Sequence, residues 1–250
     1  MKRLVGFFIL CVVALPLATA SALTVPSTSS ASPWRLVVDD RFSSGGVPGH
    51  WSRYDGPYGS GPGNCARPGN AFVKNGTMRM VLRYRSSGDC GPGWYSSGMM
   101  LSKRFESVDQ KVSVRFRVAR TDGVRGHRII PMRWPSSGSW PAAGEEDFCE
   151  GSSLGGCSTF LHHSDGQEYS HRYRVNLTRW HTVTFVRRDF TVQTFIDGKL
   201  RWTYRGTRKT LPATLKRPVL QHECNSGGCP SGRRGRETII IDWVKVWNPA

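Results

Sequence analysis

The stretch Trp140-Pro-Ala-Ala-Gly-Glu-Glu-Asp-Phe-Cys-Glu150 decides how this chain is interpreted, because it gathers acidic side chains outside any helical pattern. Side chains alternate between the two faces of a β-strand, so Glu145 and Asp147 should point the same way. Strict alternation would send Glu150 to the opposite face. One extra residue in the strand, a β-bulge, would return Glu150 to the side of the other two acids. We therefore predict a bulged strand with three carboxylates on one face.

Three acids on one face suit a reaction that needs two carboxyl groups in different protonation states. Hydrolysis of a glycosidic bond is such a reaction. On this interpretation Glu145 is the nucleophile, Asp147 orients it, and Glu150 is the acid/base, its pKa raised by the two neighbouring charges. Glu146 should face the opposite side and pair with an arginine there. From the spacing alone, a solvated acidic strand edge is the alternative.

The same run resembles the Glu-x-Asp-x-x-Glu signature of the family 16 glycoside hydrolases in its bulged form. Further segments resemble the family in the expected order: Asp40-Arg-Phe42 with Trp51, Asn70 to Met80, Tyr95-Ser-Ser-Gly98, Trp180-His181, Asp197-Gly198-Lys199 and Ile241 to Trp247. The resemblance covers the chain from about residue 35 to its end. It implies a concanavalin A-like jelly-roll β-sandwich of two antiparallel sheets. It also implies a laminarinase- or agarase-like endo-glycosidase that hydrolyses β-linkages in a β-glucan or galactan with retention.

Hydrophobic periodicity independently predicts an all-β protein. Residues 78–85 and 111–118 alternate apolar and basic or polar side chains, which is typical of half-buried strands. Asp197-Gly198 lies between two further strand-like runs and is a strong signal for a two-residue hairpin. Residues 238–247 are apolar on both faces and predict a central strand. No segment shows a sustained helical repeat.

The first 22 residues read as a secretory signal peptide: Lys2 and Arg3, an apolar core and a cleavage site of small residues. Residues 23–33 are rich in Ser, Thr and Pro and predict a disordered lead. Residues 34–250 then form one catalytic domain. The apolar core is too short to span a bilayer, and no later stretch approaches about 20 apolar residues. We therefore expect a secreted, extracellular monomer without a membrane anchor.

Removal of the signal takes seven cysteines to six, an even number that implies disulfides in an exported chain. The sequence leaves fifteen pairings open. Pairing of neighbours, each across a Gly-rich loop, is the simplest: Cys65–Cys90, Cys149–Cys157 and Cys224–Cys229. A zinc site is disfavoured because no Cys-x-x-Cys is present.

The formal net charge of +17 concerns partners rather than fold. The basic residues are dispersed along strands, which favours a solvated sheet face and argues against nucleic-acid binding. Upstream of Trp140 the family commonly carries Gly-x-Trp-Pro-Ala-x-Trp, but here the segment reads Gly126-His-Arg-Ile-Ile-Pro-Met-Arg-Trp134. Laminarinase specificity therefore does not transfer. Arg128 and Arg133 raise the alternative of an anionic polysaccharide as partner.

Sugar-binding sites use aromatic rings, which stack on the apolar face of a pyranose. The predicted stacking residues are Trp140, Trp134, Trp94 and Tyr95, whereas Trp51, Trp180 and Trp243 are assigned to the core. The resemblance places a histidine near the cleaved bond, which is His162 or His163 here; the alternative is a histidine that closes a hydrogen bond in the core. Gln221 and Glu223 are expected to line the cleft.

Two other function classes stay open from the sequence. A polysaccharide lyase would need a Tyr, His or Lys base, so the paired glutamates argue against it. A non-catalytic glycan-binding module would not need to keep all three acids. No cofactor is expected, although the resemblance allows a structural calcium at Asp242.

Overall fold

The computed structural model describes residues 33–57, 64–122, 127–152, 155–163, 168–224 and 235–250. The signal peptide predicted for residues 1–22 and the lead predicted for 23–33 lie outside this part, apart from Pro33. Residues Ser32–Ala250 form one compact unit. No helix in the described part is long and apolar enough to cross a membrane.

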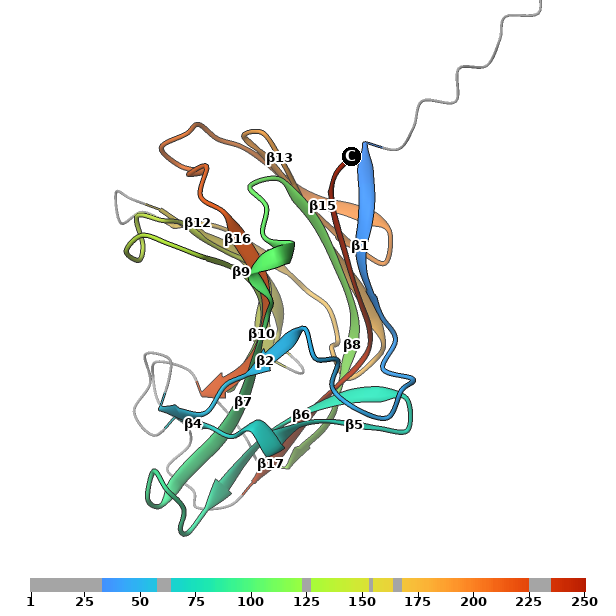
Figure 1. Ribbon diagram of the computed structural model, residues 1–250, viewed down its shortest axis with the longest axis vertical. Coiled ribbons are helices and arrows are strands. Elements are labelled where there is room, and N and C mark those ends of the chain that lie inside the picture. Colours follow the sequence, from blue (N-terminus) through green and yellow to red (C-terminus); the bar gives the residue numbers. More distant parts are fainter. Residues whose placement is uncertain (1–32, 58–63, 123–126, 153–154, 164–167, 225–234) are drawn as a thin grey trace, which may run out of the picture. The chain divides into compact units, whose positions relative to one another are not determined.

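The compact unit is built from two curved β-sheets that face each other (Figure 1). In the first sheet the neighbouring strands are β15 (Lys199–Arg205), β14 (Thr191–Ile196), β13 (His181–Arg188), β8 (Gln110–Asp122) and β17 (Arg236–Pro249). Beyond β17 the sheet continues with β1 (Trp34–Asp40), β6 (Thr77–Arg85) and β5 (Ala71–Lys74). The second sheet orders β12 (Glu168–Tyr173), β11 (Gly156–His162), β10 (Glu145–Ser152), β9 (His127–Pro135), β16 (Lys216–Cys224), β7 (Gly93–Leu101) and β2 (Trp51–Arg53).

Strand β7 links the sheets, since its first residues pair with β6 and its later ones with β16 and β2. Short strands β3 (Gly56–Pro57) and β4 (Asn64–Ala66) lie beside it, and β4–β7 is a parallel pairing. The helical content in the described part is two 3₁₀ turns, Pro68–Asn70 and Lys103–Phe105. The predicted all-β jelly-roll sandwich is confirmed.

The core lies between the two sheets. Alternating residues of β8, β13 and β17 meet those of β10, β11 and β7 in one apolar cluster. Phe148 of β10 and Phe185 of β13, for example, have ring centroids 5.4 Å apart. Trp51 is buried in this cluster as predicted. Trp180 and Trp243 are only half-buried, and Arg115 and Lys245 stack on their rings.

Strand register fixes which side chains of the second sheet face the core. Glu146 is paired with Arg133 and Leu161, and Leu161 belongs to the core cluster. Side chains directly opposite one another share a face. Glu145 and Asp147 therefore point away from the core, onto the open face of the second sheet.

Candidate active site on the open face of the second sheet

The acidic stretch forms a bulged strand, as the sequence predicted. Asp147 is paired with Phe160, but Glu150 is paired with Ser158, so β10 uses three steps where β11 uses two. The consecutive residues Phe148 and Cys149 both join the core cluster. This extra residue returns Glu150 to the face that carries Glu145 and Asp147, and the predicted bulge is confirmed.

Trp140 contacts Glu145 directly. Backbone hydrogen bonds from Ala143 to Ser139 and from Gly144 to Pro141 close a tight turn before β10. The turn places the indole over the start of the strand, where Nε1–H donates to Oε2 of Glu145 at 2.6 Å. The ring of Trp140 is 56% exposed. It thus offers a free aromatic face directly beside the carboxylate that we predict to be the nucleophile.

The electrostatics of Glu145 are dominated by burial and by its acidic neighbour. Burial, followed by the negative charge of Asp147, raises the pKa of the Glu145 carboxyl to about 8. His162 and the Trp140 hydrogen bond act in the opposite direction. The Glu145 carboxyl therefore keeps its proton through most of the neutral range, beside the charge of Asp147.

His162 completes this group. It is paired with Glu145 across β10 and β11, and its Nε2 lies 3.3 Å from Oδ2 of Asp147. Its Nδ1 lies 3.8 Å from Oε2 of Glu168. Ligand atoms of Glu145, Asp147 and His162 all lie within 4.8 Å of one another, so these three side chains are also the ones that could hold a metal ion.

Behind the open face, Glu146 lies in a buried charge cluster, defined here as Glu146 with Arg133, Arg187 and Lys216. Arg133 and Arg187 donate to its two carboxylate oxygens, and Lys216 Nζ lies 3.4 Å from Oε1. The predicted pairing of Glu146 with an arginine on the core side is present twice. Burial alone would raise the pKa of Glu146, but Arg133, Lys216 and Arg187 together lower it to about 2.

The cations of the buried charge cluster also bind backbone carbonyls of two loops. Arg133 donates to the carbonyls of Ser107 and Val108, both at 2.8 Å. Arg187 donates to those of Leu211 and Pro212, both at 2.9 Å. The cluster therefore ties β10 to both loops from behind. It also means that Arg133 faces the core and is not available to an anionic substrate on the open face.

Trp134 lies half-buried on the open face with an apolar group that the sequence did not single out: Met132, Val219, Met100 and Tyr54. Register places Trp134 opposite Arg217 and Met132 opposite Val219. This strip continues the open face from the acids across β9 and β16 to β7.

Gln221 and Glu223 lie further along β16 on the same face as Val219, since they follow it at intervals of two. Gln221 Nε2 donates to Oε2 of Glu223 at 3.4 Å. Burial raises the pKa of Tyr54 above its usual value; Arg217 opposes this shift, whereas Glu223 and Glu145 reinforce it. Tyr54 is therefore close enough to both Glu145 of β10 and Glu223 of β16 to feel their charge.

Gly98 makes room for Tyr54. The tyrosine donates its backbone N–H to the Gly98 carbonyl at 2.8 Å. A Cβ on Gly98 would meet the Tyr54 ring at 2.3 Å, too close for any side chain. Position 98 must therefore be glycine, because the Tyr54 ring packs directly against it. The glycine of the Tyr95-Ser-Ser-Gly98 segment was the sequence signal that an aromatic ring lies on this part of the sheet.

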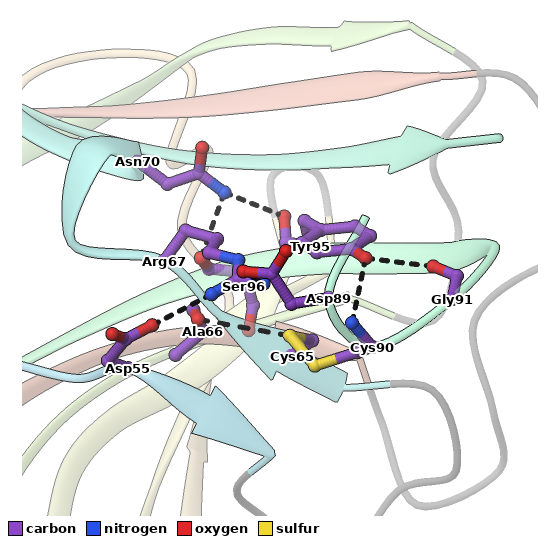
Figure 2. Close-up of a disulfide and its surroundings, with 10 residues drawn as sticks. All are labelled: Asp55, Cys65, Ala66, Arg67, Asn70, Asp89, Cys90, Gly91, Tyr95 and Ser96. Carbon is purple, nitrogen blue, oxygen red and sulfur yellow. Dashed lines mark hydrogen bonds and ion pairs between the residues drawn. A yellow bond between two sulfur atoms is a disulfide. The ribbon is translucent and has the colours of Figure 1, made fainter. Parts of the chain in front are cut away.

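Tyr95 and Trp94 are not brought to the open face as stacking surfaces. Tyr95 is 1% exposed, and its hydroxyl accepts from the Cys90 backbone N–H and donates to the Gly91 carbonyl (Figure 2). Trp94 is buried against Leu82, Tyr84 and Cys224. Tyr95 thus packs beside the Cys65–Cys90 disulfide, and Trp94 packs in a small core beside Cys224. Their burial corrects the prediction that these two rings bind sugar.

Two of the predicted disulfides are present, Cys65–Cys90 and Cys149–Cys157. The second lies within the site's own strands, since Cys149 precedes Glu150 and Cys157 is paired with Gly151. Cys224 is disulfide-bonded. Its predicted partner Cys229 lies outside the described residues, as do the side chain of Arg128 and the loop that contains Gly126.

The calcium suggested at Asp242 finds no ligand set. The carboxylate of Asp242 is paired with Arg115 across β8 and β17. In the described part of the chain, Asp242 does not belong to a group of side chains that could hold a metal ion. The acid is instead part of the charged outer surface of the first sheet.

No protein family model and no curated protein matches the chain. Solved structures do. An endo-1,3-β-glucanase (laminarinase) catalytic domain from Thermotoga petrophila is 20% identical, with 86% of this chain and 98% of that one covered and a TM-score of 0.73. A non-specific endo-β-1,3(4)-glucanase from family GH16 is 18% identical (88% and 93% covered, TM-score 0.73). An endo-acting O-glycanase of the human gut microbiota, an initiator of mucin breakdown, is also 18% identical (90% and 93% covered, TM-score 0.71).

These likenesses extend over nearly the whole of the compact unit. At such identities they show a shared fold, the jelly-roll sandwich of laminarinases and related glucanases. The chain thus has the same architecture as these enzymes, with its acidic strand β10 in the middle of the second sheet.

Proposed function

We propose that the protein is a retaining endo-glycosidase of the family 16 type, which hydrolyses β-glycosidic linkages in a polysaccharide. One observation carries the proposal: Glu145, Asp147 and Glu150 share the open face of β10 because of a bulge between them. The exposed ring of Trp140 beside Glu145 adds a stacking surface for a sugar. The shared fold with β-glucanases supports the same reaction class.

In the first step, Glu145 attacks the anomeric carbon while Glu150 donates a proton to the leaving oxygen, and a covalent glycosyl-enzyme forms. Glu145 must be ionised to attack. The Trp140 Nε1–H, which donates to Glu145, and His162 both lower the pKa of Glu145 and so favour the ionised form that attacks. Asp147 orients the nucleophile without reacting itself.

In the second step, Glu150, now ionised, takes a proton from water, and the water attacks the anomeric carbon to release the sugar with retained configuration. His162 lies beside Asp147, so the Asp147 carboxyl keeps a polar partner in both steps of the reaction. No step requires a cofactor.

The first substrates to test are β-1,3- and mixed β-1,3/1,4-glucans, since laminarinases and a β-1,3(4)-glucanase share the fold. The choice between β-glucan and galactan is left to the assay, because the segment before Trp140 differs from the laminarinase pattern. Trp140, Trp134 and Tyr54 would form an aromatic strip along the open face, with Gln221 and Glu223 as polar contacts. We further propose that the protein is secreted and acts as a monomer.

Purified mature protein should be screened on laminarin, mixed-linkage β-glucan, galactan and a polyuronide with a reducing-end assay. The configuration of the first-formed anomer should then be read by proton NMR. Cleavage in which the β-anomer of the product forms first supports the proposal. The matched control is Asp189→Asn, on an exposed turn, and it should cleave the polysaccharide as the wild type does. An α-anomer first, unsaturated products that absorb in the ultraviolet, or no cleavage of any polysaccharide would contradict it.

A further inference from the structure

A second recessed site lies at the end of the first sheet, away from the acids of β10. It is a pocket of about 420 Å³, here called the anion pocket, lined by Arg174, Val175, Asn176, Arg179, His181, Ile196, Asp197, Lys199 and Arg201. Small-molecule sites in proteins typically have a volume of about 300–1,000 Å³. The pocket is therefore large enough for a sugar unit or two.

The anion pocket is remote from Glu145. Pairing runs from Glu145 to His162 and on to Glu168, at one end of β12. Arg174 follows Tyr173, at the other end of the same strand. None of the residues that line the pocket belongs to the site on the open face, so the pocket has no part in the proposed hydrolysis.

The positive charge of the anion pocket is not compensated from within. Its one carboxylate, Asp197, accepts from His181 Nδ1 at 2.7 Å and from the Thr182 backbone N–H at 2.9 Å. Throughout the described residues, Arg174, Arg179, Lys199 and Arg201 have no carboxylate within ion-pair distance. Four cations therefore face a recess whose single acid is already occupied.

The walls of the anion pocket are fixed before any ligand arrives. The Asp197-Gly198 turn of the β14–β15 hairpin is held by the Asp197 N–H, which donates to the Thr182 carbonyl at 2.8 Å. His181 links this turn to the opposite wall, since its Nε2 lies 3.1 Å from the Asn176 carbonyl oxygen. These bonds hold the backbone that carries the four cations, whose own side chains are exposed, so the ordering cost of binding an anion falls mainly on those side chains.

The lining also indicates the class of anion. Arg guanidinium groups form planar, bidentate pairs with carboxylate and sulfate-like oxyanions. The apolar lining is limited to Val175 and Ile196, and the lining contains no Phe, Tyr or Trp. Single-stranded nucleic acid is bound largely by stacking of bases on such rings, and the His181 imidazole is already held by Asp197 and the Asn176 carbonyl.

We propose that the anion pocket binds a carboxylate- or sulfate-bearing unit of an acidic glycan, as a second site that anchors the protein to an acidic polysaccharide. That the anion is carried by a glycan rests on the proposed function; the anion chemistry itself rests on the pocket alone. Binding should weaken as salt rises, because exposed charges are screened over about 8–10 Å near physiological ionic strength.

The test is calorimetric titration of the mature protein with four probes: tetragalacturonate, a sulfated galactan tetrasaccharide, neutral laminaritetraose and a 12-base-pair DNA duplex. The pocket variant is Arg174→Ala/Arg201→Ala. Its matched control, Arg188→Ala/Arg208→Ala, removes the same charge from exposed positions at the far end of β13 and in the turn after β15. Both variants keep Glu145, Asp147 and Glu150, so hydrolysis of a neutral polysaccharide serves as the readout of folding.

We expect one or both acidic probes to bind, the pocket variant to weaken that binding at least about tenfold, and the control to change it less than about twofold. The acidic probe that binds identifies carboxylate or sulfate. Failure of both probes, an equal loss in the control, or DNA binding with the same dependence on Arg174 and Arg201 would overturn the proposal. If the proposed hydrolase function is wrong, the wild type will cleave no polysaccharide, while the acidic probe will still bind to the pocket.

Discussion

Glu145 and Glu146 are adjacent in the chain, yet the pKa of Glu145 is raised to about 8 and that of Glu146 is lowered to about 2. Burial acts in the same direction on both carboxyls, so the neighbours decide the difference. Glu145 shares its face with Asp147, whereas Glu146 faces Arg133, Arg187 and Lys216. Strand alternation alone places the Glu145 carboxyl at the proposed reaction site and the Glu146 carboxyl in the buried charge cluster.

The raised pKa of Glu145 predicts a pH-dependent effect of Glu145→Gln on stability. The folded state keeps the proton up to about pH 8, whereas the unfolded chain loses it near 4.5. The wild type therefore loses stability as pH rises through this window, and the neutral glutamine does not. The melting temperature of Glu145→Gln minus that of the wild type should increase steadily from pH 5 to pH 8. A difference that stays constant with pH would contradict the coupling of Glu145 to Asp147.

Asp147→Asn should shift the pH profile of activity. Loss of the Asp147 charge removes a cause of the raised pKa of Glu145, so Glu145 ionises at lower pH. The acidic limb of kcat/KM should therefore move to lower pH, while kcat falls because the orienting carboxyl is gone. The pH profiles of variant and wild type on the same polysaccharide provide the measurement. An acidic limb that does not move would show that Asp147 does not act on Glu145.

Glu146→Gln should be strongly destabilising without any contact to substrate. It leaves three buried cations without their carboxylate, and removal of one partner from a buried ion pair costs about 3–5 kcal/mol. The lowered pKa places this contribution above about pH 4.5 and removes it as pH falls toward 2. Urea denaturation at pH 7 and at pH 3 should show the cost shrink with acid. As a control, Asp189→Asn, which changes an exposed acid, should change stability by less than about 0.5 kcal/mol at both pH values. An equally small effect of Glu146→Gln would refute the role of the buried charge cluster.

Removal of the Cys149–Cys157 disulfide should lower both stability and activity. In the double variant Cys149→Ala/Cys157→Ala the loop of separation 8 is no longer closed, at a cost of about 2–3 kcal/mol. Glu150 follows Cys149 directly, so the loss of the bridge should also lower kcat. The double variant Cys65→Ala/Cys90→Ala, with its bridge away from β10, is the comparison and should lower stability with a smaller change in kcat. Equal kcat losses in both would contradict the link to Glu150.

The sequence was sufficient for the features that depend on local pattern. Alternation placed Glu145 and Asp147 on one face and Glu146 on the other, and the position of Glu150 required the bulge that β10 contains. Neighbour pairing of cysteines also gave the two described bridges, because each closes a short local loop.

Features that depend on contacts between distant segments were not available from the sequence. Tyr54 reaches the open face only because β2 and β7 are neighbours and Gly98 has no side chain. Arg133 resembled a substrate-facing cation, yet its register opposite Glu146 turns it into the core. Tyr95 is an aromatic residue near the family motif, but Cys90 and Gly91 bind its hydroxyl (Figure 2), and Arg67 and Arg85 lie over its ring.

The most direct test of the account compares Glu145→Gln and Glu150→Ala on the cleaved polysaccharide and on the matching dinitrophenyl β-glycoside, with and without sodium azide. Glu145→Gln should be inactive on both substrates, because no glycosyl-enzyme can form. Glu150→Ala should lose about 10²–10⁴-fold on the polysaccharide, cleave the aryl glycoside, whose leaving group needs no proton, and yield a β-glycosyl azide. Full activity of Glu150→Ala on the polysaccharide, or normal turnover by Glu145→Gln, would contradict the assignment of nucleophile and acid.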